Sequence, residues 1–233
     1  ICLMDYQIGL ELGFGGLLEK VRYYAKLYPQ QAEFYQAEED VLFGIRTWIA
    51  RTVDEIHRMA QVEQDLERKN NLQEMERINE WLIDHPPRTF REVCQFIAWI
   101  NMANRTYCRA GAGTQLDECL RPYYERDKSA GILTDDEARF IIACLFINDP
   151  HYYQIGGPDC DGRDVTSPLS FLILEAAHEV GVTVNLTIRV HDGLDPRLLR
   201  RGVEILCEDQ KGCPRFSGDK ALEEGFMRHG YSA

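Results

Sequence analysis

The spacing of hydrophobic residues changes along the chain, from a helical period in the first part to a strand-like alternation in the last. Between residues 30 and 83, apolar side chains recur every three or four residues, as at Ala37, Val41, Ile45, Ile49 and Ile56. Beyond residue 149, short β-branched or aromatic runs are each followed by a helical stretch. The pattern predicts long helical hairpins first, and then strands at about 153–156, 183–190 and 213–217 in βα units.

Local signals predict where several helices begin and end. Pro86 and Pro87 end the helix before them, and Thr89 begins the next helix as the first residue of an S/T-x-x-E capping box. A second capping box begins at Thr134 and opens an apolar helix that reaches 148. The glycines between 9 and 16 predict a loop, followed by a helix from about 17 to 27.

Composition excludes several classes of function. The 233 residues are 45% hydrophobic and 27% charged, as in ordinary globular proteins. A net charge of −12 without a long Lys/Arg cluster argues against nucleic-acid binding, and no apolar run approaches the roughly 18 residues of a membrane span. The eight cysteines show no C-x-x-C pair and no zinc spacing, which predicts reduced thiols, no metal site and a cytoplasmic protein.

One loop is specified in unusual detail by Gly156, Gly157, Asp159, Gly162 and Asp164. A calcium loop of the EF-hand type is excluded, because the chain has Arg163 and Asp164 where that pattern needs a ligand and a glycine. A phosphate-binding loop is weakly supported, since the G-x-G-x-x-G spacing and the Walker lysine are missing. On composition alone, an ordinary strand-to-helix connection is favoured.

A longer string around this loop resembles a known family. It reads Gly156-Gly157-x-Asp159-x-x-Gly162-Arg163-Asp164-x-Thr166-x-x-Leu169-Ser170-Phe171, which resembles a segment of the glycyl-radical enzymes, the pyruvate formate-lyase-like family. The strings P-P-R-T-F-R-E at 86–92 and L-D-x-x-L-x-P at 116–122 are similar to other segments of that family, in the same order. The resemblance is nearer to the dehydratase and C–X lyase branch than to formate acetyltransferase.

The resemblance implies an α/β fold, with a large helical N-terminal layer and part of a ten-stranded α/β barrel. Residues 1–148 would be the mostly helical part, and residues 149–233 would be strand–helix units of one half-barrel. We expect the chain to be an internal piece of a longer protein, without the radical cysteine and the radical glycine, and therefore inactive in isolation. None of the eight cysteines is expected to take the radical role, although Cys213 lies on a predicted strand near the barrel.

The resemblance also implies a chemistry and a set of partners. The expected activity is radical C–X or C–C cleavage of a small polar substrate by a lyase or dehydratase, in an anaerobic cytoplasm. A radical-SAM iron–sulfur activating enzyme would install the glycyl radical, and a homodimer is compatible with the family. The alternative is a non-catalytic interaction domain that kept the family scaffold.

Five residues are predicted to line the substrate site: Tyr152, Tyr153, Gln154, Cys108 and Arg109. In the family, an aromatic residue before the double glycine faces the substrate, and a loop corresponding to 108–113 approaches it. Neighbouring side chains on a strand point in opposite directions, so at most one or two of residues 152–154 can line the cavity. Arg109 fits an ion pair with a surface carboxylate equally well, and His191 and Asp192 are predicted to have structural roles.

Overall fold

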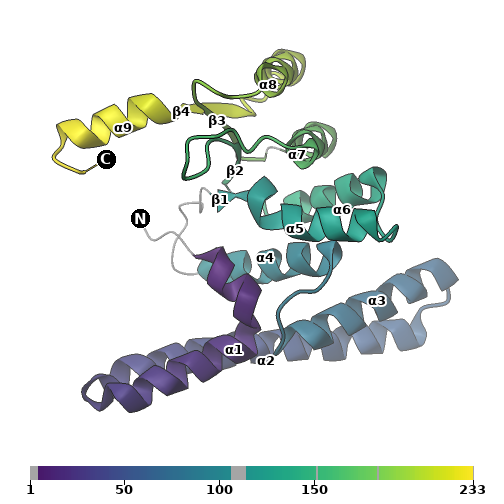
Figure 1. The fold of residues 1–233 in the computed structure, drawn as a ribbon. Helices are drawn as coiled ribbons and strands as arrows, with labels where there is room; N and C mark the ends of the chain where they lie inside the picture. The colour runs from purple at the N-terminus through teal and green to yellow at the C-terminus, as the bar shows by residue number, and fades with distance from the viewer. Residues whose placement is uncertain (1–4, 106–113, 151, 183, 233) are drawn as a thin grey trace. The chain divides into compact units, whose positions relative to one another are not determined.

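The computed structural model describes residues 5–105, 114–150, 152–182 and 184–232. The chain is mostly helical and contains one small parallel sheet (Figure 1). Its contacts divide it into two compact units, one formed by residues 5–103 and the other by residues from 104 onward. No helix in the described ranges is long and apolar enough to cross a membrane.

The first unit consists of long helices. They are α1 (Tyr6–Leu27), α2 (Ala32–Val62), α3 (Leu66–Leu82) and α4 (Phe90–Arg105), with a 3-10 turn, η1 (Pro29–Gln31), between α1 and α2. The prediction of helical hairpins over 30–83 is confirmed by α2 and α3, which lie side by side and share a cluster of Ile56, Ala60 and Leu72. Asp65 begins α3 by accepting a hydrogen bond from the Arg68 backbone N–H at 2.9 Å.

The prediction of a loop before residue 17 is wrong, because α1 already begins at Tyr6. Asp5 caps it by accepting hydrogen bonds from the two backbone N–H groups of residues 7 and 8. Gly13 interrupts the helix with a φ of 64°, and a Cβ at this position would lie 2.4 Å from the carbonyl carbon of His85. The Gly15 N–H donates to the Asp84 carbonyl at 2.9 Å. These glycines therefore allow two backbone segments to touch. Composition alone does not distinguish glycines needed for such a contact from glycines that mark a loop.

The predicted capping box at Thr89 is half confirmed. The Thr89 hydroxyl accepts from the Glu92 N–H at 3.2 Å, as expected. The Glu92 carboxylate, which is fully buried, instead accepts from the Arg88 backbone N–H at 2.6 Å and from the Arg88 guanidinium at 2.8 Å. That guanidinium in turn lies over the Trp81 ring, 3.7 Å from its centroid. The start of α4 is therefore fixed by a buried ion pair as well as by the cap.

The sheet belongs to the second unit. Its strands are β1 (Thr114–Gln115), β2 (Tyr153–Gly156), β3 (Leu186–Val190) and β4 (Arg215–Gly218), and they lie in the order β1-β2-β3-β4 with every pair parallel. The three longer strands, which the sequence predicts as βα units, are neighbours in this one sheet. The strand predicted over 183–190 is shorter than expected, and β1 was not predicted because two residues carry no periodic signal.

Helices cover one face of this sheet. They are α5 (Leu116–Ser129), α6 (Asp135–Asn148), α7 (Pro168–Glu179) and α8 (Pro196–Asp209), and α9 (Asp219–Arg228) follows β4. Figure 1 shows α7 and α8 on the same side of the strands. The core between helices and strands is formed by fully buried side chains, among them Leu120, Ile142, Phe146, Ile155, Leu169, Ile173 and Ile188. The helices α5 and α6, which the sequence analysis placed with the helical part, thus belong to the same compact unit as the sheet.

Candidate functional site

The two faces of the parallel sheet differ in chemistry. Strand alternation and register place Tyr153, Ile155, Leu186, Ile188 and Phe216 toward the helices. On the opposite face, the described residues have polar or amphipathic side chains, which are Gln115, Tyr152, Gln154, Thr187, Arg189, Arg215 and Ser217. Parallel sheets are ordinarily apolar on both faces because both are buried. We therefore take this second face, called the polar face below, as the candidate site.

The three predicted residues 152–154 are divided between the two faces. Tyr153 is buried on the helix side, where its ring packs against Phe146 and its hydroxyl donates to the Asp149 carboxylate at 2.9 Å. Tyr152 is 39% exposed and Gln154 is half-buried, and both lie on the polar face. Tyr153 thus serves the core, while Tyr152 and Gln154 are available to a ligand.

A buried carboxylate fixes the end of β2. Asp117, at the start of α5, is fully buried and accepts from the Gly156 N–H at 2.8 Å and from the Ser170 hydroxyl at 2.6 Å. The Gln115 side-chain amide donates to the Gly156 carbonyl at 2.8 Å. Both backbone groups of Gly156 are therefore held by side chains from a distant part of the chain. Asp117 also connects the start of α7, through Ser170, to the end of β2.

The electrostatic state of Asp117 follows from its burial. Loss of solvent raises the pKa of its carboxyl to about 6, although the hydrogen bonds from Gly156 and Ser170 act in the opposite direction. Neighbouring Glu118 raises the pKa further. Among the described residues no cation is paired with Asp117, so the hydrogen bonds alone stabilise its charge.

Gly157 lets an arginine approach the end of the sheet. Its φ is 94°, and a Cβ at this position would lie 2.9 Å from Nε of Arg189 and 3.0 Å from its Cζ. Arg189 is held in place by Asp219, with contacts of 3.3 Å from Nε and 2.8 Å from Nη2. The double glycine therefore provides the space in which this arginine–aspartate pair packs.

The acidic residues of the loop close turns and accept hydrogen bonds from neighbouring groups. Asp159 accepts from the backbone N–H groups of Asp161 and Arg163, both at 2.8 Å, and the hydrogen bond from Arg163 lowers the pKa of its carboxyl. The Asp164 carboxylate lies 3.1 Å from His191 Nε2, and it accepts a hydrogen bond from the Asp195 N–H at 3.1 Å. No group of three potential metal ligands occurs in the described part of the chain. The contact of His191 with Asp164 joins the loop to the segment after β3.

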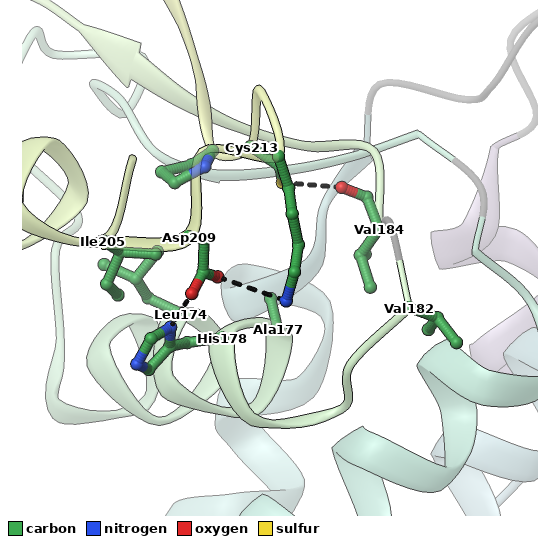
Figure 2. A pocket seen from close by; sticks show the side chains of 10 residues that line it. Leu174, Ala177, His178, Val182, Val184, Ile205, Asp209 and Cys213 are labelled. Atoms are coloured by element: carbon green, nitrogen blue, oxygen red, sulfur yellow. Dashed lines mark hydrogen bonds and ion pairs between the residues drawn. The ribbon is translucent and has the colours of Figure 1, made fainter. Parts of the chain in front are cut away.

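Cys213 lies before β4, at the amino end of the sheet (Figure 2). Its thiol donates to the Val184 carbonyl at 2.6 Å, and burial raises its pKa. The adjoining cavity measures about 10 Å³, room for one water molecule. Its polar lining includes Lys211, Asp209 and His178, whose Nδ1 lies 3.0 Å from Asp209 Oδ1 (Figure 2). A thiol that is protonated and hydrogen-bonded to the backbone has a packing role here.

The remaining predicted residues, Cys108 and Arg109, lie outside the described residues. Sequence reasoning missed Asp117, Arg189, Asp219 and Arg215. Alternation along β3 and β4 could have placed both arginines on the polar face. For Asp117 the only signal was its place in the L-D-x-x-L-x-P string.

The described residues thus form a mostly helical chain with a small parallel sheet, one face of which is polar, and a double-glycine loop fixed by a buried carboxylate. The family model described as pyruvate formate lyase-like matches residues 2–233, and the chain belongs to this family. The family uses a glycyl radical.

Two curated relatives illustrate the range of the family. The chain is 25% identical over 259 residues to the isethionate sulfite-lyase of Nitratidesulfovibrio vulgaris, covering 97% of this chain and 31% of that protein. It is 26% identical over 208 residues to the glycyl radical subunit of 4-hydroxyphenylacetate decarboxylase from Clostridioides difficile, covering 75% of this chain and 23% of that one. The chain thus spans a third or less of the length of these relatives.

A solved structure shows the same fold. The glycerol-bound form of the B12-independent glycerol dehydratase from Clostridium butyricum superposes with a TM-score of 0.89 at 22% identity, covering 99% of this chain and 33% of the other. The arrangement of helices and strands described above is therefore that of the corresponding part of a glycyl-radical enzyme.

Proposed function

We propose that these residues form part of a glycyl-radical lyase or dehydratase, and that the polar face is a wall of its substrate cavity. The observation that carries the proposal is the division of the sheet into an apolar face under helices and a polar face opposite. A ten-stranded α/β barrel with a polar ligand inside needs walls of this kind, apolar outward and polar inward.

The outer edge of the sheet supports a barrel that continues beyond β4. Within the described residues no strand pairs with the free edge of β4. The helix that follows, α9, exposes more than half of the side chains of Leu222, Phe226 and Met227. An open strand edge and an exposed apolar helix both require cover in a stable protein. Further strand–helix units of the full-length protein would supply that cover.

The roles of this chain are to bind, orient and exclude water. A radical-SAM iron–sulfur enzyme would install the glycyl radical in another part of the full-length protein. That radical would supply the abstraction of a hydrogen atom from the substrate. Tyr152 and Gln154 would contact the substrate, and Asp117 would hold the Gly156 backbone that ends the wall. Such chemistry depends on a closed cavity and on fixed substrate orientation, both of which the protein provides.

The relatives support a lyase or dehydratase, but they differ in the bond that is cleaved. Their names include a sulfite-lyase, a decarboxylase subunit and a trans-4-hydroxy-L-proline dehydratase. What these enzymes share is removal of a group from a small polar molecule. We therefore propose the reaction class, removal of a group from a small polar molecule, without naming the leaving group.

The test uses the full-length protein under strictly anaerobic conditions. We expect incubation with its radical-SAM activating enzyme, S-adenosylmethionine and reductant to produce an organic radical detected by electron paramagnetic resonance. A sample without the activating enzyme is the control, and admission of oxygen should abolish the signal. A complete reading frame without the radical cysteine and glycine segments, or no radical after activation, would refute the proposal and favour a non-catalytic scaffold.

A further inference from the structure

The polar face contains a cation with no acidic partner in the described part of the chain, Arg215. It is the first residue of β4 and is in register with Thr187 of β3. The next residue, Phe216, points to the helix side, since its ring would meet a Cβ added to Gly202 of α8 at 3.3 Å. Strand alternation therefore directs Arg215 to the polar face.

Tyr152 holds the guanidinium of Arg215 over the sheet. The guanidinium carbon lies 5.5 Å from the centroid of the Tyr152 ring, so the side chain reaches from β4 across β3 to the beginning of β2. A cation–π contact at this distance does not use up the N–H donors of the guanidinium, which can still hydrogen-bond to another partner. The edge of Arg215 can therefore still form a two-point contact with an oxyanion.

The two arginines of the polar face differ in their pairing. Arg189 is neutralised by Asp219, with an Nη2 to Oδ2 distance of 2.8 Å. Within the described residues Arg215 has no ion pair, and the side chains that share its face are uncharged apart from Arg189. The polar face thus carries one uncompensated positive charge, in a chain whose net charge is −12.

We propose that Arg215 is the specificity residue of the substrate site, and that the substrate of the full-length protein carries an oxyanion group such as a carboxylate. The inference rests on the proposed function, because it takes the polar face as the cavity wall. Arg215 is exposed in the described residues, but in the closed cavity that we propose for the full-length protein this cation would need a counter-charge, which an anionic ligand would provide. Gln154 and Thr187 lie on the same face and can hydrogen-bond to the remaining polar groups of such a ligand.

The test measures binding to the full-length, unactivated protein by calorimetry. The probes are two acid–amide pairs of nearly equal shape, lactate with lactamide and glycolate with glycolamide. We expect at least one acid to bind at least tenfold more tightly than its amide. Arg215→Gln should abolish this tenfold preference while leaving the affinity for the amide unchanged, and Arg215→Lys should restore part of it.

The matched control is Arg228→Ala, which removes one exposed arginine from α9 and should preserve the preference. Equal thermal melting of the variants establishes that each is folded. Equal affinity for acid and amide, binding of neither acid, or an unchanged preference in Arg215→Gln would each overturn the proposal. Binding needs no radical, so the two experiments are independent. If the activated protein forms a radical but does not prefer the acid over the amide, only the inference about Arg215 is overturned. An acid preference without a radical overturns the proposed function alone.

Discussion

Replacing Asp117 by Asn should remove a specific part of the pH dependence of stability. The wild-type carboxyl is fully buried, and its pKa is raised from 3.8 to about 6 in the folded protein. A raised pKa means that the folded state holds the proton more tightly than the unfolded state does. The stabilisation that this group contributes is therefore fully present below pH 3.8, and it is lost as the pH rises through about 6.

The magnitude follows from the two pKa values. One pKa unit corresponds to about 1.4 kcal/mol, so the difference between 3.8 and about 6 amounts to about 3 kcal/mol. We expect the free energy of unfolding of the wild type, relative to Asp117→Asn, to fall by about this amount between pH 4 and pH 7.

The assay is urea unfolding of the full-length protein at a series of pH values. Asp136→Asn is the control, because it removes one carboxylate from an exposed position of α6. Parallel pH curves for the wild type and Asp117→Asn would refute the reasoning, since they would show that Asp117 has the same proton affinity in both states.

Two further variants test the packing of the loop and of the first unit. Gly157→Ala should destabilise the protein by about 1–3 kcal/mol, because φ is 94° and the new Cβ would displace Arg189. Gly162 also has a positive φ, but a Cβ added there would meet nothing within 4 Å. We therefore expect Gly162→Ala to lose less free energy of unfolding in urea than Gly157→Ala, and the difference measures the clash with Arg189. Equal losses for the two variants would contradict a role for this clash. Glu92→Gln should cost about 1.5–3 kcal/mol, because a buried carboxylate loses its charge-assisted hydrogen bonds. Glu55→Gln, in an exposed pair, should change little in the same assay, and an equal effect at both positions would count against the role of burial.

Elements set by local chemistry were predictable from the sequence. The capping box at Thr134, the Pro168 start of α7 and the Asp195 cap of α8 depend on neighbouring residues only, and the structure contains all three. The order of the three longer strands followed from βα units, because consecutive parallel strands joined by a helix usually pair.

Features set by distant contacts were not predictable in the same way. The glycines of α1 were interpreted as a loop, yet Gly13 and Gly15 are required by the approach of 84–86, which only the folded chain reveals. Similarly, Asp117 is an unremarkable acid at a helix start until Gly156 and Ser170 arrive from about 40 and 50 residues away. Alternation fixed that Tyr152 and Tyr153 point in opposite directions, but only the position of α6 decides which one is buried.

The contacts of Asp117 give a physical reason for two separate strings of the sequence to occur together. One string contributes the carboxylate at 117, and the other contributes Gly156 and Ser170, which are two of its hydrogen-bond donors beside the Glu118 N–H. A buried acid with no paired cation in the described residues depends on such donors, because each hydrogen bond to a charged group contributes about 1.5–3 kcal/mol. The double-glycine loop is therefore best understood as a support that fixes the end of β2. Its acids and glycines hold this end of the sheet in place, and under the proposed function selection among substrates would fall to side chains of the polar face such as Tyr152 and Arg215.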